Sequence, residues 1–165
     1  MHMKRELNPA HVERLKELVN NSPLIKLLDM QLTDIGPGRA TVELHASEQH
    51  WNPFASVHGG VYAALIDTAA YWAAYAYQEE GTGYTSLDLN VTNLRMALSG
   101  TLTAEARAIK EGRSICLTDV LVTDEQGKLV AHGTSKLIIL EDKQSLSDAV
   151  PAMGHAPLPP KFLAE

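Results

Sequence analysis

The sequence predicts an α+β protein in which an antiparallel sheet wraps around one long helix. Residues 60–78 are rich in alanine and contain neither proline nor an internal glycine, which favours a single long helix. From residue 86 onwards apolar residues recur at every second position, in segments separated by turns, and this period is typical of strands. Two shorter strand patterns precede the helix.

The segment before the long helix contains two short helical patterns and a hairpin. Apolar residues recur at three- and four-residue spacing over residues 9–19, which predicts an amphipathic helix beginning at Asn8 and Pro9. Ser22-Pro23 restarts the helical pattern, and Gly36-Pro37-Gly38 predicts a turn. The turn joins two strands, which we expect at residues 30–35 and 39–46.

An irregular, proline-containing loop at residues 48–57 leads into the long helix. After the helix, turn residues separate four alternating segments, which we expect to form a meander. In the first of them Leu87 belongs to the apolar face and Ser86 to the polar face. The four strands are predicted at residues 86–92, 101–108, 114–123 and 129–140.

The length of 165 residues fits one domain with a real core. We divide the chain into an N-terminal helical extension at residues 1–29, the α+β domain at residues 30–140 and a proline-containing tail at residues 141–165. The tail has no sustained periodicity, so we expect an extended or partly mobile appendage and assign it no function.

Composition excludes several classes of protein. The balance of 14 basic and 20 acidic residues gives a net charge of -6, which disfavours nucleic-acid binding. The N-terminus lacks a signal-peptide pattern and no apolar stretch suits a bilayer, so we expect a cytoplasmic protein with no membrane contact. The single cysteine, Cys116, excludes an internal disulfide and is interpreted as a small buried hydrophobe. Seven scattered histidines match no metal-ligand spacing, so no metal is expected.

The tripeptide His58-Gly59-Gly60 lies where the irregular loop meets the long helix. Glycine lets the backbone approach a ligand closely, and the first N–H groups of a helix have no partner within it. Such N–H groups suit an oxyanion, although a tight turn also explains a Gly-Gly pair before a helix.

Three polar residues around this junction have both a structural and a functional interpretation. Asp67 lies two turns into the helix among small or aromatic neighbours. It is either a general base or nucleophile, or a carboxylate that bonds to a neighbouring element. Asn52 is either a turn residue before Pro53 or a donor to the same oxygen as Gly59. Ser86 is either a solvated strand residue or a part of the site.

The chain resembles the PaaI-like branch of the hotdog-fold thioesterases over residues 25–140. The resemblance rests on the ordered combination of Asn52, His58-Gly59-Gly60, Asp67, the Ser86-Leu87-Asp88-Leu89-Asn90 strand and Asn93-Leu94-Arg95. It implies a single hotdog domain, in which the antiparallel sheet wraps the long central helix.

The resemblance also implies a reaction, the hydrolysis of an acyl-CoA thioester to a carboxylic acid and CoA without a cofactor. Asn52 and the Gly59 N–H would polarise the thioester carbonyl. Asp67 would activate water or attack directly, Ser86 would orient that water, and His58 would brace the loop. In this family the site forms between subunits, which implies a homodimer or a dimer-of-dimers tetramer.

Candidate contacts to CoA follow from charge, because an acidic protein needs local positive groups to bind phosphates. Arg95 and Arg113 carry this charge and lie after strands where the resemblance implies contacts with the nucleotide, and we add Gly60, Gly112 and Ser114 as uncharged candidates; the charged groups in the turn are also explained as solvated surface residues. Met96 and Ala97 follow Arg95 where the family usually has proline first, so the chain path there departs from the family pattern.

Aromatic residues concentrate in and around the junction, and we assign most of them to core packing and some to an acyl pocket. They are Trp51, Tyr62, Tyr71, Trp72 and Tyr75. Two other functions stay open: an acyl-thioester dehydratase that recruits His58 with Asp67, and a non-catalytic acyl-CoA-binding sensor. The sequence leaves the acyl group open.

Overall fold

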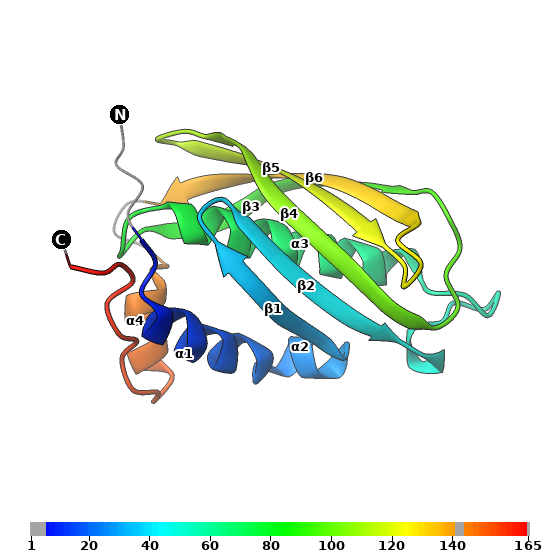
Figure 1. The fold of residues 1–165 in the computed structure, drawn as a ribbon, viewed down its shortest axis with the longest axis horizontal. Coiled ribbons are helices and arrows are strands. Elements are labelled where there is room, and N and C mark those ends of the chain that lie inside the picture. The colour runs from blue at the N-terminus through cyan, green and yellow to red at the C-terminus, as the bar shows by residue number, and fades with distance from the viewer. Residues whose placement is uncertain (1–5, 141–143, 165) are drawn as a thin grey trace.

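The computed structural model describes residues 6–140 and 144–164 and consists of a six-stranded antiparallel sheet wrapped around one long helix, α3 (Figure 1). The predicted α+β class is therefore confirmed. The elements are α1 (Pro9–Asn20), α2 (Pro23–Leu27), β1 (Met30–Gly36), β2 (Arg39–Ala46), the short 3-10 helix η1 (Glu48–His50), α3 (Gly59–Tyr77), β3 (Gly83–Asn93), β4 (Gly100–Glu111), β5 (Ile115–Thr123), β6 (Leu129–Leu140) and α4 (Leu146–Ala152).

Helix α3 is the centre of the core. Its sheet-facing residues are fully buried, and most of them are small, so the helix backbone lies close to the sheet. Gly133 of β6 makes the closest approach possible, because a Cβ there would lie 2.7 Å from Ile66 Cγ2 and 2.8 Å from the Asn90 carbonyl oxygen. The fully buried residues of α3 are Leu65, Ile66, Ala69, Ala70, Ala73 and Ala74.

The sheet order is β1-β2-β4-β5-β6-β3, so the predicted four-strand meander is wrong for its first strand. β4, β5 and β6 do pair in sequence, but β3 pairs with β6 and forms an edge of the sheet. A period of two identifies a strand without identifying its partner, and consecutive strands are neighbours in only about two-thirds of cases. The hairpin of β1 and β2 is confirmed.

The N-terminal helix begins where the sequence predicts. Asn8 caps α1, since its Oδ1 accepts a hydrogen bond from the Ala10 N–H at 3.0 Å, and Pro9 occupies the first turn. The buried side of α1 presents Leu15 and Val19 to the core.

The C-terminal segment is not the extended appendage that we expected. It contains α4, and beyond it Lys161 is 1% exposed, with Nζ donating to the Tyr75 and Gln78 carbonyls at the end of α3. Burial lowers the pKa of Lys161 to about 7, and its hydrogen bonds to the last carbonyls of the helix fasten the segment to α3. Residues 141–143 and 165 of the predicted tail, and residues 1–5 of the N-terminal extension, lie outside the described residues.

Two further features bear on function. Cys116 is fully buried, and burial raises the pKa of its thiol to about 11, as fits a small core residue rather than a nucleophile. Within residues 6–140 and 144–164, no helix combines the length and apolar character needed to cross a bilayer.

Candidate active site

The loop before α3 is closed on itself by Asn52. Its side-chain Oδ1 accepts from the Phe54 N–H at 2.8 Å, and its Nδ2 donates to Ser56 Oγ at 3.0 Å. Trp51 and Val57 form a bridge across the base of this loop. These bonds hold the half-buried Asn52 amide in one orientation and leave its second Nδ2 hydrogen available to a ligand.

The first turn of α3 offers one open donor. His58 caps the helix, and its Nδ1 accepts from the Gly60 N–H at 2.8 Å. The Val61 N–H donates to the His58 carbonyl at 2.9 Å. Among the described residues the Gly59 N–H has no acceptor, so it is the amide of this turn that can donate to an oxyanion. The Gly60 N–H already donates to His58, so it is not available to a substrate; the predicted contact of Gly60 with the substrate would need another atom.

Asn52, Gly59 and Arg95 line a common hollow of about 320 Å³. The structure thus brings together three of the residues that the sequence singled out. The same hollow contains Tyr62 and Asn93, to which the sequence assigned no such place. A Cβ on Gly59 would lie 2.9 Å from Asn93 Nδ2, so a larger residue at position 59 would displace the Asn93 side chain. Tyr62 belongs to the aromatic group for which core packing and an acyl pocket were both considered; it is 3% exposed and lies in the core, and it also lines this hollow.

Asp67 and Ser86 form the second group. Ser86 Oγ donates to Asp67 Oδ1 at 2.9 Å, which joins the middle of α3 to the first half of β3. Asp67 is half-buried and Ser86 is exposed. A β-bulge lies between Ser86 and Asp88, and Leu87 is 53% exposed. The predicted burial of Leu87 is therefore wrong, because the bulge interrupts the alternation and β3 is an edge strand.

The two groups are far apart within one chain. Gly59 and Asp67 are separated by eight residues of α3, which corresponds to about 12 Å along the helix axis. A nucleophile and an oxyanion donor must both lie within about 3–3.5 Å of the reacting group. Within one chain, the Gly59 N–H and the Asp67 carboxylate therefore do not reach the same thioester group.

The turn at Gly112, Arg113 and Ser114 joins β4 to β5. The Gly112 N–H donates to the Ile115 carbonyl at 3.1 Å, and the Ser114 carbonyl accepts from Ile139 at 2.9 Å. Ile115 is paired with Ile138, which in turn is paired with Thr85 near the start of β3. Arg95 follows the end of β3, so the structure places the two predicted phosphate contacts at opposite ends of this sheet.

No group of three or more histidine, cysteine, aspartate or glutamate side chains in the described part of the chain has an arrangement suited to a metal ion. The two groups described above contain a carboxylate, a hydroxyl, an amide and a backbone N–H.

A six-stranded antiparallel sheet wrapped around one long central helix is the architecture of the hotdog fold. Residues 54–131 match the family described as the thioesterase superfamily. Human acyl-coenzyme A thioesterase 13 is 32% identical over 104 residues, covering 62% of this chain and 74% of that protein. The proofreading thioesterase EntH of Klebsiella pneumoniae is 30% identical over 128 residues, covering 78% and 90%.

The solved structure of the PaaI protein from the phenylacetic acid degradation operon of E. coli aligns with a TM-score of 0.72 at 25% identity, covering 81% of this chain and 97% of that one. The chain belongs to the thioesterase superfamily and to its PaaI-like hotdog branch. It is accordingly an enzyme that hydrolyses thioesters.

Proposed function

We propose that the protein hydrolyses acyl-CoA thioesters with a site built from two subunits, and that water is the only other reactant. The hydrogen-bonded pair of Asp67 and Ser86, separated along α3 from an open Gly59 N–H, is the observation that carries this proposal. The names of human acyl-coenzyme A thioesterase 13 and of EntH support thioester hydrolysis, and the former supports CoA as the carrier.

In the proposed reaction Asp67 acts on the thioester carbonyl carbon by one of two routes. As a general base, it takes a proton from a water molecule held by Ser86 while the water oxygen attacks the carbon. The C–S bond then breaks, and the CoA thiolate receives the proton. As a nucleophile, Asp67 itself forms a mixed anhydride with the acyl group, expels the thiolate, and water cleaves the anhydride.

The carbonyl oxygen gains negative charge in either route and needs donors. The Gly59 N–H and the free Nδ2 hydrogen of Asn52 suit this role, because both face one hollow and Asn52 is fixed by its own loop. His58 serves as a brace in this proposal, since its Nδ1 is engaged by the Gly60 N–H.

A homodimer supplies the missing proximity. β3 is an edge strand, and exposed apolar residues lie on it or directly after it, namely Leu87, Leu94 and Met96. If β3 pairs with a second β3 about a two-fold axis, the strands run antiparallel, and the end of one lies beside the beginning of the other. Gly59 contacts the end of β3 and Asp67 contacts its first half. The oxyanion donors of one subunit therefore approach the carboxylate of its partner.

The same pairing accounts for the divided phosphate contacts. Arg95 follows the end of β3, whereas Arg113 lies beyond its beginning, so antiparallel pairing moves Arg95 of one subunit to the same end as Arg113 of the other. We propose that these two side chains bind CoA phosphates from different subunits.

Thiol release from a panel of acyl-CoAs tests the proposal. Wild-type protein should release CoA from at least one acyl-CoA, and Asp67→Asn should lower kcat by about 10²–10⁴-fold, the usual contribution of general acid–base catalysis. Tight CoA binding without release from any substrate would contradict hydrolysis and favour an acyl-CoA sensor. A dehydratase would instead convert a 3-hydroxyacyl-CoA without releasing thiol.

A further inference from the structure

A second hollow, of about 340 Å³, lies between the α1–α2 corner, α3 and α4, and Asp67 lines it. It is separate from the hollow that contains Asn52 and Gly59. In the proposed function, residues from both hollows act on the same thioester. Its lining comprises Leu18, Val19, Ser22, Leu24, Ile25, Asp67, Thr68, Tyr71, Trp72, Leu146 and Met153.

The walls of this hollow present hydrocarbon. Asp67 is the charged residue in the lining. The aliphatic hydroxyls belong to Ser22 and Thr68, and both donate hydrogen bonds to backbone carbonyls. Ser22 Oγ donates to the Val19 carbonyl at 2.7 Å, and Thr68 Oγ1 donates to the Ala64 carbonyl at 2.7 Å. Besides Asp67, the polar atoms that the lining residues offer are the Tyr71 hydroxyl and the Trp72 indole N–H, whereas an apolar ligand group would be removed from water along the remaining walls.

Aromatic side chains form a fixed floor. The rings of Tyr71 and Trp72 meet edge to face at 5.1 Å, and Tyr71 meets Tyr84 in the same way at 6.0 Å. The hollow extends along α3 from Asp67 to Trp72, a rise of five residues, which corresponds to about 7.5 Å along the helix axis. Its volume lies near the lower end of the range of about 300–1,000 Å³ for small-molecule sites.

We propose that this hollow binds the acyl group, and that it selects an apolar acyl group of the size of a medium-length alkyl chain or a single aromatic ring. The inference rests on the proposed function. A thioester has an apolar acyl end and a polar CoA end. The hollow at Asn52 offers amides and Arg95, whereas this one offers hydrocarbon, and Asp67 stands at its boundary.

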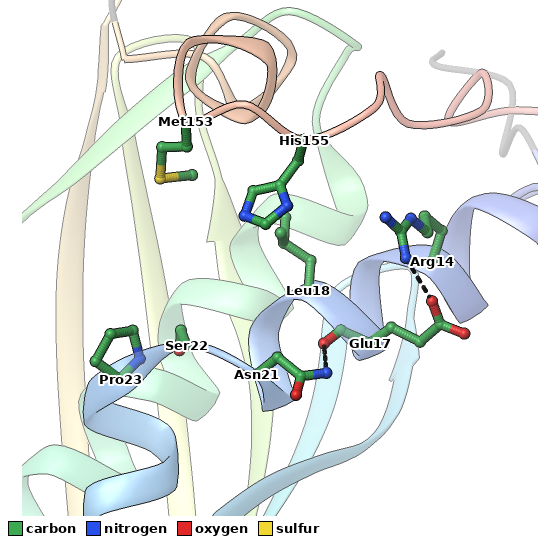
Figure 2. A pocket seen from close by; sticks show the side chains of 8 residues that line it. All are labelled: Arg14, Glu17, Leu18, Asn21, Ser22, Pro23, Met153 and His155. Atoms are coloured by element: carbon green, nitrogen blue, oxygen red, sulfur yellow. Dashed lines mark hydrogen bonds and ion pairs between the residues drawn. The ribbon is translucent and has the colours of Figure 1, made fainter.

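Met153 limits the length of the acyl chain. Directly after α4, it separates the acyl hollow from an outer hollow of about 370 Å³, and Leu18, Ser22 and Met153 line both. Figure 2 shows Met153 and His155 on one side of the outer hollow and Ser22 and Pro23 on the other. The outer hollow also contains the ion pair of Arg14 and Glu17, with the two atoms 2.7 Å apart, so it is more polar.

This assignment gives the terminal segments a role in substrate choice. Leu18 and Leu24 come from the N-terminal extension, and Leu146 and Met153 come from the C-terminal segment. All four lie outside residues 54–131, which match the thioesterase superfamily. The family core, together with Asn52 just before it, would then supply the reaction, while the terminal segments would complete the acyl hollow.

The test compares kcat/KM for acetyl-, butyryl-, hexanoyl-, octanoyl-, decanoyl- and phenylacetyl-CoA in three variants. Met153 is 60% exposed, so a larger side chain is accommodated without disturbing the core. Met153→Trp should lower the ratio of octanoyl-CoA to acetyl-CoA turnover at least about tenfold, the effect of lost apolar contacts in a pocket. Met153→Ala should shift the preferred chain towards decanoyl-CoA. Leu163→Trp, which adds the same bulk to the same segment outside the hollow, should leave the ratio unchanged.

A binding experiment separates this inference from the reaction itself. The thioethers S-octyl-CoA and S-ethyl-CoA are not hydrolysed, and calorimetry gives their Kd values. Wild-type protein should bind the octyl compound at least about tenfold more tightly, and Met153→Trp should abolish the difference. Equal Kd values in wild-type protein, or a chain-length profile that neither Met153 variant alters, would overturn the acyl pocket while leaving thioester hydrolysis intact. Absence of hydrolysis with a retained octyl preference would overturn the proposed function alone.

Discussion

His58 is the residue on which the brace and the general-base interpretations differ most clearly. In the structure its Nδ1 accepts from the Gly60 N–H at 2.8 Å and caps α3. Asparagine can accept the same bond but cannot act as a base near neutral pH, whereas alanine can do neither. The pair His58→Asn and His58→Ala therefore separates the two roles.

The size of the effect follows from the cap. Loss of a side-chain N-cap costs about 0.5–2 kcal/mol, and in a chain of this length each kcal/mol lowers Tm by about 2–4 °C. We expect His58→Ala to lose about 1 kcal/mol and about tenfold in kcat/KM, because the neighbouring Gly59 N–H is held less firmly. His58→Asn should restore Tm and leave kcat/KM within about threefold of wild type, since capping is what the side chain contributes.

Thermal unfolding and thiol release, both at a fixed protein concentration, provide the measurements. If His58 is the base that a dehydratase would recruit, both variants lose about 10²–10⁴-fold in activity whatever their Tm values. An Asn variant with wild-type Tm and the activity of the Ala variant would refute the brace.

Further predictions concern packing and pH. Gly133→Ala should lower the free energy of unfolding by about 1–3 kcal/mol, because its Cβ meets both Ile66 and the backbone of β3; an unchanged urea midpoint would show that the approach of α3 is looser than described. Burial lowers the pKa of His11 from its ordinary value of 6.5, and the nearby Lys161 lowers it further. The unfolded chain therefore binds a proton first as pH falls, and stability should decrease as pH drops through about 6.5. Urea unfolding between pH 7 and pH 5.5 should show a weaker pH dependence in His11→Asn than in wild type, whereas a matched His155→Asn variant should keep it.

The sequence predicted the central elements because local patterns determine them. The alanine-rich α3 and the cap at Asn8 depend on nearby residues alone. The partner of β3 depends on how residues 94–99 carry the chain past β6 and β5 to β4, and alternation contains no such information. α4 was missed because Pro151 lies inside it and proline disfavours a helix interior. Burial of Val150, which is 1% exposed, offsets that preference.

The candidate site divides in the same way. The ordered motif predicted Asn52, Gly59 and Asp67 as functional residues, and the structure assigns the first two to one hollow and Asp67 to another. The contact of Asn93 with Gly59 joins residues 34 positions apart in the sequence. No pattern of neighbouring residues predicts such a contact, because it depends on how the helix packs against the end of β3. The acyl hollow is harder still to foresee, because Leu18 and Met153 belong to opposite ends of the chain.

The cross-subunit site is the central claim, and hybrid dimers test it most directly. Asn52→Ala and Asp67→Ala proteins, each inactive alone, are mixed under conditions in which native mass spectrometry demonstrates subunit exchange. Each hybrid dimer then contains one intact site and one doubly altered site, and a random mixture should recover about a quarter of wild-type activity. Activity that stays at the level of the separate variants, although hybrids have formed, would contradict the two-subunit site.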